Sequence, residues 1–475
     1  MKTYDVIVIG GGSGGLTVAA GAAQFGAKVA LVEKRNELGG DCLHFGCVPS
    51  KSLIAVAKEV YHLHQSAQAF GLSVSGTLKW QDAKRRVEQA VGTIQDHDGA
   101  QRFRDLGVDV IFASATFQDE HSIKLSSGTT IKGKRIVIAT GSSPIVPPVE
   151  GAEQITQLTN ETVFSMDELP KRIVMIGGGP VGLELSQALS RLGAEVIVVD
   201  SGDRLLQKED EDIAEVVRKQ IEKEITFFPS TTVEKVTKRD NKTFVTLKGN
   251  HSQEVVADAL FFASGRKPNT DKLRLDKAEV KVDDKGAIIV KETLQTSQPH
   301  IYAVGDVNGQ FPFTHGAGHE GKVVVANAVF GLRRKVSYDH VPWAFYTDPE
   351  IFHLGMTEEE VRYQHNEDYK VYRMDSKSVD RMIAENDKSS LIKIITDNKG
   401  IILGAHGVGN SAGDWMQQLV YMKTNGDSVK KISNSVYPYP SRGEIVKHAG
   451  DLYWRERLFG SKLSTLMNKY VSIFR

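Results

Sequence analysis

One glycine-rich pattern occurs twice in this sequence, and it constrains the fold more than any other feature. Each copy has a short apolar strand pattern, three glycines spaced as G-x-G-x-x-G, a helical pattern and then a second strand pattern. The spaced glycines are Gly10, Gly12, Gly15, Gly177, Gly179 and Gly182. A strand, a tight turn and a helix in this order begin a parallel βαβ unit. The repetition therefore predicts two such units, each with the local geometry that binds a dinucleotide.

The first copy supplies the parts that a bound pyrophosphate and ribose require. Gly10 permits the tight turn, Gly12 lets the backbone approach a pyrophosphate, and Gly15 allows the helix to pack closely on the strand. The N-terminus of the helix offers N–H groups and positive potential to the phosphates. Glu33 ends the next strand, close to the expected spacing, and can accept a hydrogen bond from a ribose hydroxyl.

The second copy ends its second strand with Asp200. A carboxylate at this place accepts a hydrogen bond from a free 2′-hydroxyl and repels a 2′-phosphate, which favours NADH. Sites for NADPH usually have an arginine nearby, and Arg204 follows shortly after Asp200. The sequence therefore predicts NADH and leaves NADPH open.

Composition narrows the class of protein around these two units. The chain has 475 residues, which predicts two to four domains. Lys plus Arg and Asp plus Glu both number 59, and this neutral balance argues against a nucleic-acid binder. The sequence has no apolar run long enough to predict a membrane span, and residues 1–5 enter a strand pattern without a leader peptide. We therefore expect a cytoplasmic protein.

The sequence has two cysteines, Cys42 and Cys47, and they lie close together. A secreted disulfide scaffold would have more cysteines at wider spacing. Pro49, near the start of a helical pattern, places Cys47 at a helix N-terminus, which favours a thiolate. A structural zinc site needs four ligands, and His44 could add only one. A reactive pair and two unpaired buried cysteines are the hypotheses that remain.

The stretch from Gly39 to Lys51 closely resembles the active-site segment of the FAD-dependent pyridine nucleotide-disulfide oxidoreductases, which include glutathione reductase, lipoamide dehydrogenase and mercuric reductase. Three later segments resemble motifs of this family in the right order: 139–141, 263–269 (with Ser264 in place of the usual Thr) and 301–306. The resemblance implies FAD and NAD(P)H as cofactors and a homodimer. The cofactor-binding residues that it adds are Gly40, Asp41, Thr140, Gly141, Gly265, Gly305 and Asp306, the last at the ribityl chain.

The resemblance also implies catalytic roles. Cys42 is expected to be the interchange thiol that meets the substrate, and Cys47 the charge-transfer thiol beside the flavin. Lys51 and Glu184 match the family's ion pair near the flavin N5. A cation there stabilises negative charge on the reduced flavin, and a carboxylate holds the cation in place.

The sequence departs from the family at the position of its acid–base residue. Disulfide reductases of the family have a His-Pro segment in which a Glu follows the His, and the His moves protons for the thiols. Here Tyr439 is at the His position and Glu444 at the Glu position, and in the implied homodimer both reach the partner subunit's cysteines. A tyrosine has an ordinary pKa near 10, so at pH 7 it can donate a proton but is a poor base. The substitution argues against fast exchange with a disulfide substrate.

A tyrosine near this position is also a feature of mercuric reductase. Those enzymes have a C-terminal cysteine pair, whereas no cysteine follows Cys47, so the chain resembles mercuric-reductase-like members without that pair. His315 and His319 are expected to pack against the flavin domain rather than to act as a base or bind a metal. The basic tail 455–475 is expected to pack in the core or at an interface, and contact with a membrane surface is the alternative.

Together these features predict an α/β protein with two Rossmann-like dinucleotide-binding domains and an α+β C-terminal dimerisation domain. The expected boundaries are 1–150 with 271–342 for FAD, 151–270 for NAD(P) and 343–475 for the dimer interface. The predicted enzyme passes electrons from NADH through FAD to a Cys42–Cys47 disulfide and on to a disulfide or metal-ion acceptor that the sequence does not name. Dihydrolipoamide dehydrogenase, a metal-ion or quinone reductase, and an FAD-bound redox sensor without turnover are the alternatives.

Overall fold

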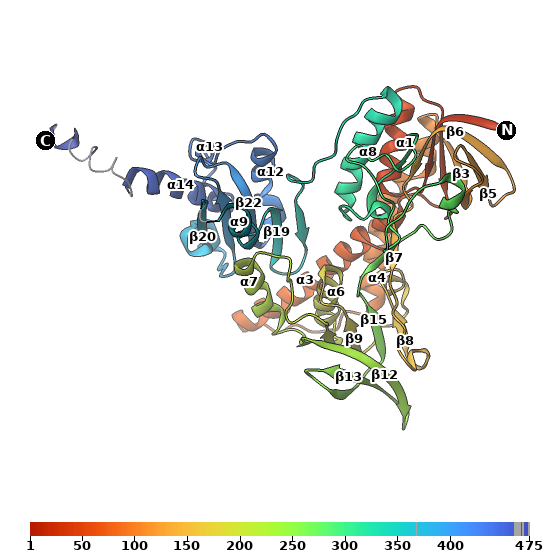
Figure 1. The fold of residues 1–475 in the computed structure, drawn as a ribbon. Coiled ribbons are helices and arrows are strands. Elements are labelled where there is room, and N and C mark those ends of the chain that lie inside the picture. The colour runs from red at the N-terminus through yellow and green to blue at the C-terminus, as the bar shows by residue number, and fades with distance from the viewer. Residues whose placement is uncertain (367, 460–466, 468–469, 474–475) are drawn as a thin grey trace. The chain divides into compact units, whose positions relative to one another are not determined.

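The chain forms two compact units in the structure, which is a computed structural model (Figure 1). The structure describes residues 1–475 except 367, 460–466, 468–469 and 474–475. The first unit contains Met1–Asp203 and Ile225–Tyr338, and the second unit contains Arg204–Glu224 and Asp339–Arg475.

The first sheet of the first unit has the first glycine turn at the end of a central strand. Its strands follow the order β3-β2-β1-β6-β5-β4, and β17 also pairs with β6. The pairs around β1 and the β6–β17 pair are parallel, whereas β4 and β5 add an antiparallel edge to β6. The strands are β1 (Lys2–Ile9), β2 (Val29–Glu33), β3 (Asp109–Phe112), β4 (Ala115–Phe117), β5 (Ser122–Leu125), β6 (Thr130–Ile138) and β17 (Ile301–Ala303).

Side chains of β1 alternate between two cores, because successive residues of a strand point to opposite faces. Val6 and Val8 pack in the core that helices α1 (Ser13–Gln24) and α8 (Thr314–Phe330) cover, and Figure 1 shows these two helices side by side. Ile7 lies in the core on the other face of the sheet. Burial on both faces explains why the second half of β1, residues 6–9, is a continuous apolar run.

The second sheet of the first unit is parallel throughout and has the order β11-β10-β9-β15-β8. Its central strand β9 leads into the second glycine turn. A three-stranded antiparallel sheet, β12-β13-β14, and a two-stranded pair, β7–β16, complete the unit. The strands are β7 (Ser142–Pro144), β8 (Thr156–Leu158), β9 (Arg172–Ile176), β10 (Glu195–Val199), β11 (Thr226–Phe228), β12 (Thr231–Arg239), β13 (Lys242–Gly249), β14 (Gln253–Val256), β15 (Ala259–Phe262) and β16 (Arg266–Pro268).

Most of the remaining helices of the first unit lie between the two glycine turns in the sequence. Helix α3 packs against both α4 and α6, and α6 is the helix that follows the second turn. These helices are α2 (Gly40–His44), α3 (Cys47–Phe70), α4 (Trp80–Asp98), α5 (Ala100–Asp105) and α6 (Pro180–Arg191), with short 3-10 turns at η1 (Ala152–Gln154), η2 (Val163–Ser165), η3 (Leu275–Ala278) and η4 (Gly305–Asn308).

The second unit is built on an antiparallel sheet of five strands with the order β18-β19-β22-β21-β20. The strands are β18 (Trp343–Phe345), β19 (Glu350–Gly355), β20 (Lys370–Asp375), β21 (Leu391–Thr396) and β22 (Ile402–Gly409). The helices are α7 (Glu211–Ile221), α9 (Glu358–His365), α10 (Asp380–Ala384), α11 (Ala412–Trp415), α12 (Gln417–Thr424), α13 (Lys430–Ser433) and α14 (Glu444–Phe459), with a 3-10 turn at η5 (Ser376–Ser378).

Buried polar side chains tie the segment 204–224 to this sheet. The Glu209 carboxylate accepts a hydrogen bond from Trp343 Nε1 at 3.0 Å and lies 2.9 Å from His353 Nδ1. Lys393 is 3% exposed and donates to Asp210 Oδ1 at 2.9 Å. Buried charges are tolerated when they are paired, so these contacts explain why the segment packs with the second unit.

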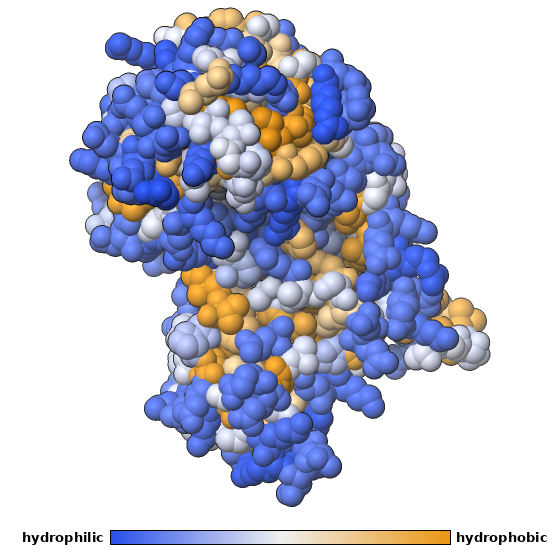
Figure 2. Space-filling view, turned by 90° about the vertical axis from the view of Figure 1, so that its right-hand side faces the viewer, coloured by the Kyte–Doolittle hydropathy of each residue, from blue (hydrophilic) through white to orange (hydrophobic). Residues whose placement is uncertain are grey.

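The predicted α/β class is confirmed, because parallel βα sheets and an antiparallel α+β unit occur in one chain. The face of the molecule in Figure 2 is largely hydrophilic, with hydrophobic side chains in small groups. Among the described residues, no helix is both long and apolar enough to cross a bilayer.

Candidate active site

The two glycine-rich turns have nearly the same backbone geometry. Gly10 has φ +111° and Gly177 has φ +114°, a conformation that residues with a side chain rarely adopt. A Cβ at Gly15 would lie 1.9 Å from Gly10 O, and a Cβ at Gly182 would lie 2.0 Å from Gly177 O. The last glycine of each motif therefore lets its helix approach the strand end without a side chain between them.

Both turns are open where a diphosphate would lie. Helices α1 and α6 begin after Gly12 and Gly179, and neither has a side-chain cap on its first N–H groups. A Cβ at Gly179 would meet nothing within 4 Å, and a Cβ at Gly12 would meet only Gly40 Cα, at 3.8 Å. Uncapped helix N-termini beside open glycines suit an anionic phosphate. The residues present therefore fit two dinucleotides.

A carboxylate closes each turn from the end of the neighbouring strand. Glu33 accepts hydrogen bonds from two backbone N–H groups, at 2.7 and 2.9 Å, and Asp200 accepts two at 2.6 and 2.7 Å. In each turn one of these donors is the glycine that directly follows the first motif glycine, which is Gly11 for Glu33 and Gly178 for Asp200. A carboxylate has about four acceptor sites, so each can still accept from a ribose hydroxyl.

The first turn is covered by the segment that leads to the cysteines. The Gly39 N–H donates to Gly11 O at 2.8 Å. Gly40 has φ +62°, and a Cβ added to it would lie 2.6 Å from Gly12 Cα. Helix α2 begins at Gly40, so this backbone contact fixes the start of the helix that contains Cys42 directly on the first turn.

The two cysteines are free thiols in consecutive helices. Cys42 lies in α2 and is half-buried, whereas Cys47 is exposed and is the first residue of α3. The prediction that Cys47 begins a helix is thus confirmed. Cys47 Sγ lies 3.3 Å from Thr314 Oγ1 at the start of α8.

Interaction between the two thiols shifts their pKa values in opposite directions. It lowers the pKa of Cys47 to about 6; Thr314 and the Lys51 charge add to this effect, and desolvation of the sulfur atom opposes it. The same interaction raises the pKa of Cys42 well above its ordinary range, and burial raises it further. At pH 7 Cys47 is therefore the thiolate of the pair and Cys42 holds the proton.

An ion pair connects the cysteine helix to the helix of the second turn. Lys51 lies one turn after Cys47 in α3, and its Nζ donates to Glu184 Oε2 of α6 at 2.6 Å. The Glu184 side chain is 6% exposed and that of Lys51 is 33% exposed, so one side of the ammonium group faces solvent. The structure brings together the two residues that the sequence singled out, and their role stays a prediction.

The two strand-end motifs, 139–141 and 263–269, are hydrogen-bonded to each other. Thr140 Oγ1 donates to Asn269 O and Asn269 Nδ2 donates to Thr140 O, both at 2.9 Å. Gly141 has φ +66° and Gly265 has φ +139°, and these turns precede the paired strands β7 and β16. The predicted cofactor residues of both motifs therefore lie where the two sheets are joined.

One arginine reaches two of the carboxylates that the sequence assigned to the cofactors. Arg266 Nη2 lies 3.2 Å from Asp41 Oδ1, and its Nε lies 3.8 Å from Asp306 Oδ2. Ser142 Oγ donates to Asp306 at 2.5 Å and accepts from Arg266 Nε at 2.7 Å. The sequence placed Arg266 in a motif but gave no sign of this bridge.

Glu320 is a fully buried carboxylate to which the sequence pattern assigned no role. Its Oε2 accepts from the Gly305 N–H at 2.6 Å and from Asn308 Nδ2 at 2.9 Å, and the Tyr338 hydroxyl donates to Oε1 at 2.5 Å. Burial raises the pKa of Glu320. These bonds fix the turn at Gly305 that presents Asp306, and the signal in the sequence was the one acidic residue of α8.

Tyr439 lies in the second unit and is hydrogen-bonded to a residue that the sequence did not indicate. Its hydroxyl donates to Asp380 Oδ2 at 2.7 Å, which raises the pKa of Tyr439. The Glu444 carboxylate instead accepts the Ser441 N–H at 2.9 Å, within its own turn. Asp380 is 59 positions from Tyr439 in the chain, so no local pattern could have shown the pair.

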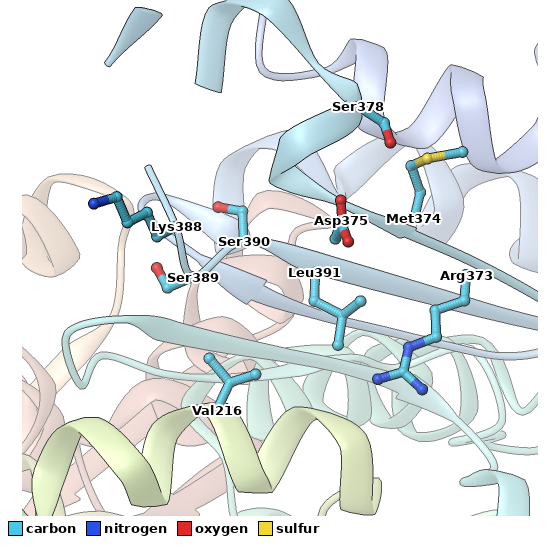
Figure 3. A pocket seen from close by; sticks show the side chains of 9 residues that line it. All are labelled: Val216, Arg373, Met374, Asp375, Ser378, Lys388, Ser389, Ser390 and Leu391. Carbon is cyan, nitrogen blue, oxygen red and sulfur yellow. The ribbon is translucent and has the colours of Figure 1, made fainter. Parts of the chain in front are cut away.

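The second unit also has a hollow of about 410 Å³ beside its sheet (Figure 3). Figure 3 shows Val216 facing it from α7, and Arg373 and Leu391 from the strands. Arg373 is paired with Asp212 at 3.0 Å. The lining residues are Val216, Arg373, Met374, Asp375, Ser378, Lys388, Ser389, Ser390 and Leu391, none of which the sequence assigned to a site.

The two histidines and the basic tail are the remaining candidates that the sequence raised. His315 lies in α8, with its ring centroid 5.6 Å from that of Phe313 and 6.1 Å from that of Phe311. Within the described part of the chain, no group of three or more His, Cys, Asp and Glu side chains is arranged to hold a metal ion. Helix α14 includes the start of the tail, up to Phe459, and most of the remaining prediction for 455–475 falls on 460–466, 468–469 and 474–475, outside the described residues.

Two dinucleotide turns, one of them joined by its backbone to a polarised thiol pair, define a class of protein. It is a redox enzyme that holds two nucleotide cofactors and exchanges electrons with cysteines. Residues 4–321 match the family model of the pyridine nucleotide-disulphide oxidoreductases, and residues 341–450 match the dimerisation domain of that family. The chain belongs to the pyridine nucleotide-disulphide oxidoreductases, which are FAD- and NAD(P)H-dependent enzymes. The predicted family, enzyme class and cofactors are thereby confirmed, and the dimerisation domain supports a homodimer.

The relatives include enzymes with different substrates. The mercuric reductase of Lysinibacillus sphaericus is 32% identical over 94% of this chain and 82% of that protein. The dihydrolipoyl dehydrogenase of Thermus scotoductus is 34% identical over 96% of this chain and 99% of that protein. Among solved structures, the Cu(II) complex of the HOCl-induced flavoprotein disulfide reductase RclA from Escherichia coli is 26% identical, with a TM-score of 0.84 over 95% of this chain and 100% of that chain.

Proposed function

We propose that this protein is an NADH-dependent flavoenzyme that reduces a soft, thiophilic metal ion at Cys42 and Cys47. One observation supports this choice of acceptor above the others. The thiol pair is polarised for reaction, with the Cys47 pKa at about 6, whereas the acid–base position is Tyr439, an exposed phenol hydrogen-bonded to Asp380.

The first glycine turn would hold FAD and the second would hold NADH. When bound, FAD accepts a hydride from the reduced nicotinamide and supplies two electrons for the thiol pair. On this proposal, residues 1–150 and 271–342 form the FAD domain, 151–270 form the NADH domain and 343–475 form the dimer interface. The FAD contacts would come from Gly10, Gly12, Gly15, Glu33, Gly40, Asp41, Thr140, Gly141, Gly265, Gly305 and Asp306, and the NADH contacts from Gly177, Gly179, Gly182 and Asp200.

The thiol pair and its neighbours would manage charge and protons. Cys47 stays a thiolate above about pH 6, so reduction of the Cys42–Cys47 disulfide takes up one proton rather than two at pH 7. Lys51 would balance the negative charge near Cys47, and the buried Glu184 holds the ammonium group in place. Cys42 is the thiol that holds the remaining proton and would meet the acceptor.

A metal ion is the acceptor that best tolerates a tyrosine at position 439. Reduction of a disulfide substrate requires a proton for each departing thiolate, and a base to ready the attacking thiol. A soft metal ion instead binds thiolates directly and releases their protons to solvent. A phenol with a raised pKa is a weak base at pH 7, which hinders the first reaction and leaves the second unaffected.

The electron count of the overall reaction balances both for a metal ion that takes two electrons and for one that takes a single electron. One NADH loses two electrons and becomes NAD⁺ with release of one proton. One Hg²⁺ ion takes both electrons to give elemental mercury, or two Cu²⁺ ions take one electron each to give Cu⁺. Mercuric reductases are among the relatives, and the RclA structure is described as a Cu(II) complex, so both ions are suitable first probes.

A second candidate is dihydrolipoamide dehydrogenase, which is favoured by the 34% identity to the Thermus scotoductus enzyme over almost its whole length. The experiment that separates the two follows NADH oxidation with mercuric chloride, cupric chloride or lipoamide as acceptor. The natural protein is compared with Tyr439→His, Cys42→Ser and Cys47→Ser. The purified proteins are checked for equal FAD content before the rates are compared.

The metal-reductase proposal predicts NADH oxidation with a metal ion that either cysteine substitution abolishes. It also predicts slow lipoamide reduction by the natural protein and faster reduction by Tyr439→His. Brisk lipoamide turnover by the natural protein, with no metal-dependent oxidation, would instead identify a dihydrolipoamide dehydrogenase. NADH oxidation with none of the acceptors would contradict both proposals and favour a redox sensor.

A further inference from the structure

Tyr439 is part of an exposed turn in the second unit that precedes α14. Its side chain is 71% exposed, and its hydroxyl donates to Asp380 Oδ2 at 2.7 Å. A phenol has one proton to donate, and here that proton is directed to Asp380. The oxygen atom therefore has only lone pairs to offer to any other group.

The backbone at Asp380 lies between residues that are anchored in the core of the second unit. Val379, which precedes α10, and Met382 within α10 are completely buried there. The turn of Tyr439 is fixed to the same helix a second time, because Arg442 pairs with Glu385 at the end of α10. The contacts of Tyr439 and Arg442 with this helix thus set the orientation of the tyrosine relative to it.

Glu444 has a different hydrogen-bond partner from Tyr439. Its carboxylate accepts the Ser441 N–H at 2.9 Å and so stabilises the start of α14. Asp380 and Glu444 are the two charged groups that act on the Tyr439 hydroxyl, and Asp380 has the larger influence. The neighbouring Arg381 is paired with Glu385.

We propose that Asp380 is the positioning residue of Tyr439: it takes the only hydroxyl proton as a hydrogen bond and presents the phenol oxygen as an electron-pair donor. This inference rests on the proposed function, because it specifies how the tyrosine serves a cationic acceptor. An oxygen that offers lone pairs, with a carboxylate behind it, attracts a metal ion. The same oxygen is a poor proton donor to a departing thiolate, which disfavours a disulfide.

The first test is independent of turnover. The tyrosinate absorbance of the protein is titrated with alkali, and the difference from Tyr439→Phe isolates this one phenol. Asp380→Asn should lower the pKa of Tyr439 toward its ordinary value near 10, because the charged acceptor is lost. Glu444→Gln is the matched control and should change this titration much less.

The second test is a double-mutant cycle on metal-dependent NADH oxidation. In the Asp380→Asn variant the side-chain amide can donate a hydrogen bond to the phenol oxygen, which would turn the hydroxyl proton away from residue 380. We therefore expect kcat/KM for the metal ion to fall about tenfold, the effect of losing one charged hydrogen bond. Tyr439→Phe should fall by a similar factor, and the double variant should fall no further, since the two residues act through one group. Flavin reduction by NADH, measured separately by stopped flow, shows whether a loss belongs to the acceptor step.

The outcomes separate this inference from the proposed function. Absence of metal turnover in the natural protein, with the Tyr439 titration shifted by Asp380→Asn, rejects the metal acceptor and retains Asp380 as the partner of the tyrosine. Metal turnover that is unaffected by Asp380→Asn, or additive losses in the double variant, would overturn the inference. It would also be overturned if Glu444→Gln, rather than Asp380→Asn, shifted the tyrosine titration.

Discussion

The two glycine-rich turns of this protein share a backbone and differ in what surrounds them. Both have a glycine at φ near +110°, both leave the helix N-terminus uncapped, and both end in a carboxylate that accepts the N–H of the turn. The first turn is covered by Gly39 and Gly40, whereas a Cβ at Gly179 of the second turn would meet nothing within 4 Å.

We propose that this difference separates a resident cofactor from an exchanging one. A nucleotide at the first turn would be enclosed by the segment that begins α2 and would lie beside the thiols. A nucleotide at the second turn could enter and leave. Only the first turn is joined through its own backbone to the cysteines, so it is the one suited to hold a flavin through many turnovers.

The largest effect should come from closing each turn with a side chain. Gly15→Val would place a branched side chain against Gly10 O, and we expect the purified protein to lack FAD. Gly182→Val should retain FAD but lose reduction by NADH by on the order of 100-fold, which corresponds to roughly 3 kcal/mol of overpacking. Visible absorbance and stopped-flow flavin reduction measure the two effects.

Gly92→Ala in α4 is the control for the glycine substitutions, because a Cβ there would meet nothing within 4 Å. It should leave both the flavin content and its reduction unchanged. Equal loss of FAD in Gly15→Val and Gly182→Val would break the distinction between a resident and an exchanging nucleotide.

An effect on flavin reduction of similar size, without loss of FAD, is expected from the ion pair between Lys51 of α3 and Glu184 of α6. Lys51→Met removes the cation near Cys47 and should slow flavin reduction by about 10²-fold, the scale for loss of one preorganised charge. Glu184→Gln should cost less, because the lysine remains. Stopped-flow traces of the flavin measure the rate, and Lys58→Met on the same helix serves as the control. Unchanged flavin reduction in Lys51→Met would show that the pair is structural only.

The two carboxylates allow a matched comparison of the turns. Asp200→Ala should raise the preference for NADPH over NADH by about tenfold in kcat/KM, because repulsion of a 2′-phosphate and one charged hydrogen bond are lost together. Glu33→Gln should weaken FAD binding and leave the nucleotide preference as it is. A change of preference in Glu33→Gln, or none in Asp200→Ala, would reverse the assignment of the two turns.

The smallest effect concerns the pKa of the thiolate beside the first turn. Thr314→Val removes a hydrogen bond to Cys47, and the pKa should rise from about 6 by about one unit. The thiolate forms as pH rises through this pKa. The absorbance of the reduced enzyme that depends on the Cys47 thiolate should therefore appear at higher pH in the variant. At pH 8 the two proteins should be nearly equal, and a loss at all pH values would indicate misfolding instead.

Much of the fold and part of the site could be predicted from the sequence, because the informative patterns are local. The glycine spacing before Gly15 and Gly182 specifies a turn that few other residues could form. Pro49 marked the beginning of a helix, and α3 does begin at Cys47. The predicted α+β C-terminal domain also corresponds to an antiparallel sheet of its own.

Other features depended on the tertiary structure, since they join residues that are distant in the chain. The hydroxyl of Thr314 reaches Cys47 across 267 positions, and the carboxylate of Asp380 reaches Tyr439 across 59. A hydrogen bond needs two groups at about 3 Å in the right orientation, and nothing in either local segment encodes its partner. The sequence by itself therefore determined which cofactors and which thiols the protein could use. Only the tertiary structure placed Thr314 beside Cys47 in the first unit and Asp380 beside Tyr439 in the second unit.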